Sequence, residues 1–140
     1  MSGSKRNSRA MIGPQLIQSP FEADVQAITI RETVMTANTT VCVIIAAKNA
    51  ATTIARAVRS ALAEPAVQEV IVVDDGSTDT TGAQALSADD GTQRLKIIRF
   101  DQNRGPAAAR NCAIDSSTAP LLAILDADDF FLPGRFAQFM

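Results

Sequence analysis

The sequence predicts an α/β fold with three layers, in which helices cover both faces of a mainly parallel sheet. Two observations lead to this prediction. Short apolar runs rich in β-branched residues recur after residue 38, and segments with helical periodicity lie between them. The runs are continuous rather than alternating, which is typical of strands that are covered on both faces. Short right-handed connections between such strands favour one parallel sheet between two layers of helices.

Four segments are predicted strands. The continuous apolar runs "VCVII", "VIVV" and "LLAIL" occupy residues 41–45, 70–73 and 121–125. A further run, "LKIIRF" at residues 95–100, contains Lys96 and Arg99. Two charged side chains in so short a run favour a strand near the edge of the sheet.

The first predicted helix lies around residues 54–62, where apolar residues recur three and four positions apart. We expect Asn49 or Thr52 to cap its start, because short polar side chains accept bonds from the free N–H groups of a first turn. Pro65 prevents the helix from continuing much further.

Two more helices are expected, and they complete the order β-α-β-α-β-α-β. The second covers residues 78–88, and Asp79, with Ser77 or Thr78, is expected to cap its start. The third covers residues 106–116, where a proline occupies the first position and alanines follow it.

Residues 1–38 are expected to form a flexible or loosely packed N-terminal segment, and residues 39–140 a single domain. The basic start of the chain is not followed by the apolar stretch of a secretory signal, and no apolar run is long enough to span a bilayer. Cys42 and Cys112 are expected to be buried free thiols. We therefore expect a cytoplasmic location, with any membrane association arising from regions outside this chain.

The composition excludes several classes of function. A net charge of −2 gives no general attraction to nucleic acid. The chain has no histidine, which excludes Ser-His and Cys-His catalysis and imidazole metal sites.

Acidic residues gather where two predicted strands end. Asp74 and Asp75 follow one strand, and Asp126, Asp128 and Asp129 follow another. The carboxyl ends of parallel strands meet at one rim of a sheet, where ligands bind. A hard divalent cation with oxygen ligands would relieve the repulsion among these carboxylates and leave positions open for phosphates. Helix capping is the alternative explanation for single acids after strands.

Two glycine turns lie near the same rim. Gly76 and Gly105 leave room for a ligand close to the backbone. Arg104 and Arg110 flank the second turn and are expected to face an anion.

Four motifs in a fixed order resemble the inverting glycosyltransferases of family 2, which have the GT-A fold. They are "VIIAAKNA", "VIVVDDGSTDTT", "NRGPAAARN" and "LLAILDADDFFLPGRF", and the resemblance runs from about residue 41 to residue 140. It implies a Rossmann-like nucleotide-binding half of an enzyme of glycan or polysaccharide synthesis. It also implies a nucleotide-sugar donor, most often a UDP-sugar, a glycan or lipid-linked acceptor, and Mn²⁺ or Mg²⁺.

The resemblance assigns the nucleotide-side residues by position. Asp75 matches the acid that bonds the base, and Arg110 lies on the nucleotide side of the site. The loop along the nucleoside is matched by Ala46, Ala47, Lys48 and Asn49.

The remaining matches concern the metal. Asp126 matches the first acid of the DxD motif, near ribose and metal, and Asp128 matches the direct metal ligand. Asp74 and Asp129 match supporting residues, and Asp74 is expected to anchor the turn after its strand.

Two departures from the family pattern matter. Lys48 stands where the family often has an aromatic residue, so it cannot stack on a base but can approach a phosphate. The acceptor half, with the Asp or Glu that acts as catalytic base, is expected beyond Met140. The base is therefore unassigned, and this chain alone is expected to bind donor without transferring sugar.

Two other interpretations compete with this one. A receiver domain also carries acids after strands, but its acidic pair follows the first strand and its phosphoacceptor the third. Here the predicted pair follows the second strand and the acidic cluster the fourth. A non-catalytic fragment or interaction module is the other alternative.

Overall fold

The computed structural model describes residues 39–137. The expectation for residues 1–38 lies outside the described residues. Within the described range no helix is long and apolar enough to cross a membrane.

Four strands and three helices alternate, as the sequence predicts. Their order is β1 (Val41–Ala47), α5 (Ile54–Leu62), β2 (Val67–Asp75), α6 (Thr81–Ser87), β3 (Leu95–Phe100), α7 (Pro106–Ser116) and β4 (Leu121–Ile124). All neighbouring strands are parallel, and the sheet order is β3-β2-β1-β4. The α/β prediction is therefore confirmed, and the sheet is wholly parallel in this part of the chain.

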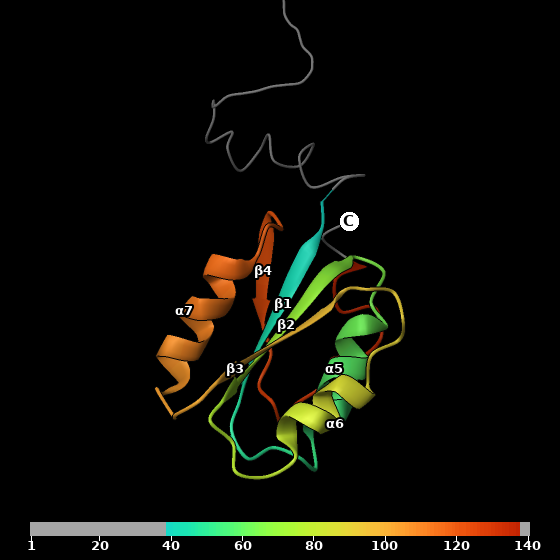
Figure 1. Cartoon of the computed structure of the whole chain (residues 1–140). Coiled ribbons are helices and arrows are strands. Elements are labelled where there is room, and N and C mark those ends of the chain that lie inside the picture. The colour runs from blue at the N-terminus through green and yellow to red at the C-terminus, as the bar shows by residue number, and fades with distance from the viewer. Residues whose placement is uncertain (1–38, 138–140) are drawn as a thin grey trace, which may run out of the picture. The chain divides into compact units, whose positions relative to one another are not determined.

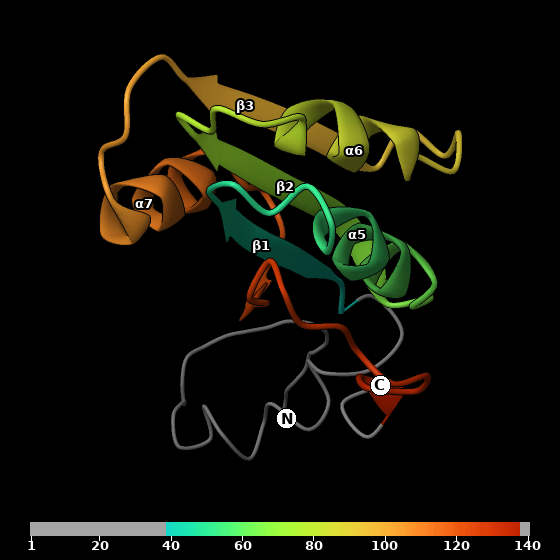
Figure 2. The same ribbon diagram turned by 90° about the horizontal axis from the view of Figure 1, so that it is seen from below.

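Helices cover both faces of the sheet and make two cores (Figure 1). Helices α5 and α6 pack on one face, and α7 packs on the other, as Figure 2 shows from below. Ile45 and Val72 belong to the α5 side, whereas Ile44 and Ile71 belong to the α7 side, and all four are fully buried. Strands β1 and β2 are thus covered on both faces, which explains their continuous apolar sequences.

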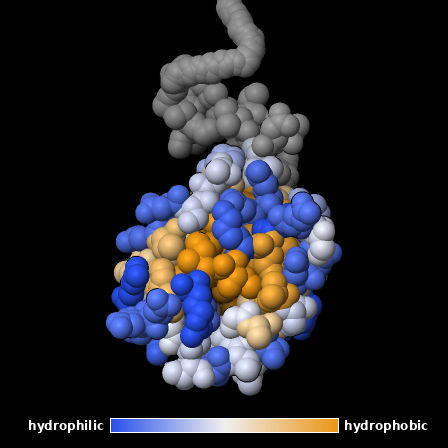
Figure 3. Space-filling view, viewed as in Figure 1, coloured by the Kyte–Doolittle hydropathy of each residue, from blue (hydrophilic) through white to orange (hydrophobic). Residues whose placement is uncertain are grey.

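Strand β3 lies at an edge of the sheet, as its charges predict. Its apolar residues Leu95, Ile97 and Ile98 are half-buried, whereas Lys96 is exposed. In the view of Figure 1, hydrophobic residues gather over the middle of the molecule, where the strands run, and hydrophilic residues surround them (Figure 3).

Strand β4 corrects one expectation, because only one of its faces is covered. Leu122 is 45% exposed and Ile124 is 53% exposed. These residues pair with Cys42 and Ile44 of β1, so they point to the α7 side of the sheet. Helix α7 packs on β1 and β2 and leaves this part of the face open. An apolar run therefore did not establish burial on both sides.

The expected cap of α5 is also wrong. The residue before the helix is Thr53, and no side chain caps its first turn. The carboxamide of Asn49 instead accepts a bond from the N–H of Thr78, in the loop after β2.

The cap residue of α6 is Thr80, which makes no side-chain cap bond, so the prediction holds only in that Asp79, one position earlier, bonds the first helical N–H. The Asp79 carboxylate accepts a bond from the N–H of Thr81, 2.9 Å away. Ser77 and Thr78 do not cap the helix but bond the β1–α5 loop.

Both cysteines are free thiols, as predicted, with Cys42 buried and Cys112 half-buried. Burial raises the pKa of the Cys42 thiol, which keeps this group protonated in the core.

Candidate functional site

A hollow of about 440 Å³ lies at the carboxyl ends of β1 and β4. The two strands are neighbours in the sheet, so residues far apart in the sequence meet there. Its lining residues are Ala46, Lys48, Asn49, Ala50, Thr52, Thr53, Asp126, Ala127 and Asp128. The structure therefore brings together five of the predicted site residues: Ala46, Lys48, Asn49, Asp126 and Asp128.

Asp126 and Asp128 are both exposed. Within residues 39–137 neither carboxylate has a hydrogen-bond or ion-pair partner. Hard divalent cations prefer such oxygen donors, and magnesium-type sites often use only one or two carboxylates together with substrate phosphates. The donor set therefore fits such an ion, although the described residues contain no cluster of three or more metal-ligating side chains.

The β1–α5 loop is fixed by the loop that follows β2. The N–H of Asn49 donates to the Ser77 hydroxyl over 2.8 Å, and the Thr78 N–H donates to the Asn49 carboxamide over 2.8 Å. Asn49 has φ 51°, in the left-handed region that asparagine tolerates. Next along, the Ala50 N–H donates to the Thr81 hydroxyl. The β1–α5 loop, held in this way by the loop after β2, forms one wall of the hollow.

Lys48 is exposed on the same wall. Among the described residues its ammonium group has no hydrogen-bond or ion-pair partner. A free ammonium group beside two free carboxylates suits a ligand that carries both a metal ion and phosphates.

Asp74 anchors the turn after β2, as expected. Its side chain is fully buried, and its carboxylate accepts a bond from the N–H of Ser77 over 3.1 Å. It also forms an ion pair with Arg99 of β3, and Arg99 donates in addition to the Ser77 carbonyl. Asp74 is thus a structural acid rather than a free ligand.

Asp75 has more partners than its predicted role requires. It is 3% exposed, and its carboxylate accepts three bonds from the β3–α7 loop. The donors are the Asn103 amide at 2.8 Å, the Arg104 N–H at 2.6 Å and the Gly105 N–H at 2.9 Å. A carboxylate has about four acceptor sites, so one site remains, on Oδ1, which accepts a single bond.

Three predicted residues do not line the hollow. Ala47 is buried at the end of β1, Asp75 holds the β3–α7 loop, and Arg110 is half-buried on α7. The Nε of Arg110 is buried without a hydrogen-bond partner in the described part of the chain. The guanidinium of Arg104 lies over the Phe100 ring, 4.3 Å from its centre.

Asp79, which precedes α6, connects the start of this helix to the β1–α5 loop through hydrogen bonds. The hydroxyl of Thr81 donates to Asp79, and this bond lowers the pKa of the Asp79 carboxyl. Asp79 also accepts from the Ala51 N–H. The carboxylate therefore stays ionised to lower pH than a free aspartate, and its bonds to both loops are lost only as the pH falls through that depressed pKa.

Sequence reasoning missed the contacts of several residues that shape the site. Asn103, Ser77 and Arg99 each bond an acid or a loop at the rim. Asn103 is the first residue of "NRGPAAARN", and a polar residue before an Arg-Gly turn was the available signal. The sequence indicated Arg99 only as a charged residue of an edge strand, because its ion-pair partner, Asp74, is distant in the sequence.

Comparison with known proteins gives a consistent result. Residues 42–140 match the family model described as Glycosyl transferase family 2. The chain is 64% identical over 104 residues to the succinoglycan biosynthesis protein ExoU of Rhizobium meliloti (strain 1021), covering 74% of this chain and 30% of that protein. It is 38% identical over 99 residues to the UDP-Glc:alpha-D-GlcNAc-diphosphoundecaprenol beta-1,3-glucosyltransferase WfaP of Escherichia coli, covering 70% of this chain and 39% of that protein.

A solved structure agrees with the sequence relatives. The chain is similar to S. aureus TarS 1-349 in complex with UDP, with a TM-score of 0.59 and 28% identity, covering 65% of this chain and 28% of that one. The chain spans only 30% and 39% of the length of the two curated relatives above. The family match covers well over half of the chain. The chain belongs to glycosyl transferase family 2 and has the GT-A fold of that family.

Proposed function

We propose that this chain is the donor-binding part of a glycosyltransferase that moves a sugar from a nucleotide diphosphate to an acceptor. One observation carries the proposal. The exposed side chains of Asp126, Asp128 and Lys48 line one hollow at the carboxyl ends of parallel strands, and none has a polar partner within residues 39–137. A donor diphosphate with its cation presents the complementary charges to this set.

UDP is the proposed nucleotide. In support, TarS is a structural neighbour that was solved with UDP, and the name of WfaP specifies UDP-Glc as its donor. The free acceptor site on Oδ1 of Asp75 suits an N–H donor, and uracil carries one on its Watson–Crick edge. Ala46 and Asn49 would lie along the nucleoside, because both line the hollow on the side of the β1–α5 loop.

Asp126 and Asp128 are the proposed holders of Mn²⁺ or Mg²⁺. When bound, such an ion neutralises the donor diphosphate and stabilises it as a leaving group. Lys48 supplies a second positive charge to the same phosphates. The hydrogen bonds from backbone N–H groups to the Ser77 and Asn49 side chains, which join the loops after β1 and β2, keep this wall fixed before the donor arrives.

The proposed acceptor is a glycan or a lipid-linked sugar in polysaccharide synthesis, at the cytoplasmic side of the cell. The names of the relatives support this class, since one concerns succinoglycan biosynthesis and the other a diphosphoundecaprenol-linked sugar. Inversion also requires a base within reach of the attacking hydroxyl. We assign no base within residues 39–137, because the buried acids there already hold loops.

UDP is expected to bind the purified chain more tightly when Mn²⁺ is present, and Asp128→Asn is expected to remove most of this enhancement. An amide is a weaker ligand than a carboxylate for a hard cation, and we expect the enhancement to fall at least about tenfold. Calorimetric titration of UDP with and without Mn²⁺ measures it.

Asp115→Asn is the matched control, since Asp115 is an exposed acid on α7 outside the hollow. Equal enhancement in the wild type and in Asp128→Asn would remove Asp128 from the site. Loss of enhancement in the control as well would show a general charge effect.

A further inference from the structure

Three side chains at intervals of four residues project from one face of α5 toward the segment that follows β4. They are Arg56, Ser60 and Glu64, and the spacing of four places them in one row along a helix. Glu64 stands just beyond the last helical residue, but its N–H still bonds the Ala61 carbonyl, which continues the turn. The row therefore runs along the whole helix and past its end.

Each member of this row bonds backbone in residues 128–136. Nη2 of Arg56 donates to the Asp128 carbonyl over 3.4 Å. The Ser60 hydroxyl oxygen accepts from the N–H of Phe131 over 3.0 Å. Glu64 accepts from two N–H groups in the same segment, Gly134 at 3.0 Å and Phe136 at 3.4 Å.

Of the three residues in the row, Glu64 binds the segment most strongly. The residue is 4% exposed, so its charge is almost fully removed from water. A buried carboxylate is costly unless it accepts hydrogen bonds, and both bonds shown for Glu64 are to this one segment. Residues 128–136 form no regular helix or strand ladder, so their N–H groups need such partners. The Glu64 carboxylate therefore gains the hydrogen bonds that its burial requires, and two N–H groups of residues 128–136 gain an acceptor.

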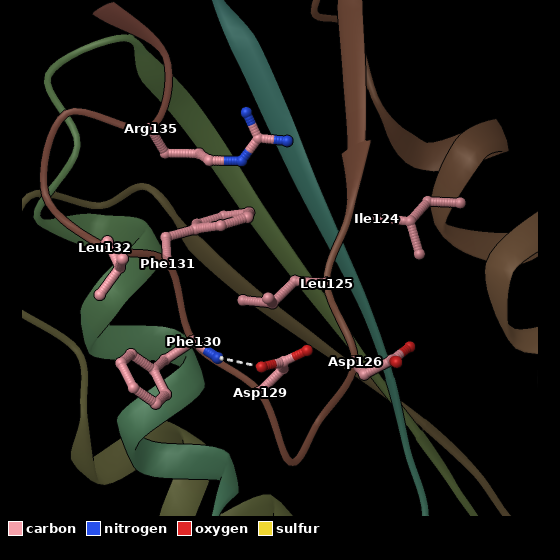
Figure 4. A pocket seen from close by; sticks show the side chains of 8 residues that line it. All are labelled: Ile124, Leu125, Asp126, Asp129, Phe130, Phe131, Leu132 and Arg135. Atoms are coloured by element: carbon pink, nitrogen blue, oxygen red, sulfur yellow. Dashed lines mark hydrogen bonds between the residues drawn. The ribbon is translucent and has the colours of Figure 1, made fainter.

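Apolar contacts run in parallel with these bonds. Phe136 is buried in the core that contains Ile54, Ala57 and Ala61 of α5, and Phe131 packs against the same core. The guanidinium of Arg56 lies 4.4 Å from the centre of the Phe130 ring. Figure 4 shows Phe130 in front of helix α5, drawn in green, with Asp129 next to it in the loop and Asp126 just after the end of the strand.

Helix α5 thus connects the two walls of the hollow. The loop that leads into the helix supplies lining residues on one wall, including Ala50 and Thr53. The row on its side holds the segment that continues from Asp128 on the other wall. The helix therefore bonds the segment of one wall and leads out of the other, in addition to the pairing of β1 with β4 from which both walls leave.

We propose that Arg56, Ser60 and Glu64 are positioning residues, which set where the Asp126 and Asp128 carboxylates lie relative to the β1–α5 loop. The inference rests on the proposed function, because the effect that it predicts is a change in metal-dependent nucleotide binding. The statement that α5 holds residues 128–136 in place rests on the contacts alone and does not require the proposed function. Residues that orient metal ligands commonly change metal affinity by about 10–100-fold when they are replaced.

The test compares Glu64→Ala, Glu64→Gln and the control Glu69→Ala in the whole chain. Glu69 serves as the control because it is a largely buried glutamate, with 16% of its side chain exposed, that accepts a backbone bond from Thr118 but lies away from the hollow. We expect Glu64→Ala to reduce the Mn²⁺ enhancement of UDP affinity about tenfold and to leave UDP affinity without metal within about twofold. Glu64→Gln is expected to be intermediate, because one of its two terminal atoms still accepts a bond.

Full Mn²⁺ enhancement in Glu64→Ala would overturn the proposal, and so would an equal loss in Glu69→Ala. If Glu64→Ala does not fold, Arg56→Ala gives the same test at an exposed position, with a smaller loss expected because one bond is removed. Unchanged enhancement in that variant would then overturn the proposal.

Amide exchange separates this inference from the proposed function. The N–H groups of Phe131 and Gly134 are expected to exchange faster in Ser60→Ala and Glu64→Gln respectively, with β1 and β2 unchanged. If the wild type shows no Mn²⁺ enhancement, the proposed function fails, and these amides still decide whether α5 holds the segment. Unchanged exchange at both amides would overturn the inference itself.

Discussion

Asp75→Ala is expected to lower the free energy of unfolding by about 3 kcal/mol. The carboxylate is buried and accepts bonds from Asn103, Arg104 and Gly105. Hydrogen bonds to a charged group contribute about 1.5–3 kcal/mol each, and two of the donors are backbone N–H groups with no partner to replace it. The three contributions are not additive, because the loop relaxes once the first bond is lost.

Urea unfolding of the two proteins measures the difference. Asp101→Ala is the matched control, since Asp101 is an exposed acid in the same β3–α7 connection, without a hydrogen-bond partner in the described part of the chain. We expect the control to stay within about 0.5 kcal/mol of the wild type. An equally small change for Asp75→Ala would mean that these bonds do not order the loop in solution.

Gly76→Ala is expected to destabilise the chain by about 3 kcal/mol, for two separate reasons. Gly76 has φ +70°, which an L side chain adopts at a cost of about 1–2 kcal/mol. An added Cβ would also lie 2.6 Å from the Asn103 nitrogen and 2.8 Å from the Gln102 carbonyl carbon. Both atoms are backbone, so relief requires the whole loop to move, at a further cost of about 1–3 kcal/mol.

Gly91→Ala separates these two costs. Gly91 has φ +80°, but nothing lies within 4 Å of an added Cβ. We therefore expect this variant to lose about 1 kcal/mol, the conformational cost alone. Equal losses for the two glycine variants would show that the close approach of residues 102–103 to Gly76 contributes nothing. The double variant Asp75→Ala with Gly76→Ala is expected to lose less than the sum of the single losses, because both residues hold one loop.

The sequence was sufficient for the elements and insufficient for their long-range contacts. Continuous apolar runs identified β1 and β2, and the charges of Lys96 and Arg99 correctly indicated an edge for β3. Helix α7 has the predicted bounds, because proline and alanine at its start act locally. The predicted cap of α5 was wrong because the candidate residue has a long-range partner instead of a local one. Asn49 bonds Thr78 of another loop, and no local pattern identifies that partner.

The candidate site divides in the same way. The topology rule correctly brought acids after β2 and β4 to one rim, and Asp126 and Asp128 share a hollow with Lys48 and Asn49. The rule could not separate free acids from acids with internal partners. Asp75 and Glu64 look like any other acid in the sequence, and only the folded chain shows the N–H groups that they accept from.

The central position of β1 has a consequence for the order of folding during synthesis. Strand β1 is the first strand within residues 39–137, yet it lies between β2 and β4. Its second edge therefore stays unpaired until the ribosome has released residues 121–124, the last strand described. Unpaired edges of apolar strands attract other extended chains. The nascent chain thus carries β1 paired on one edge only until residues 121–124 are available, and a chaperone has a surface to bind during this interval.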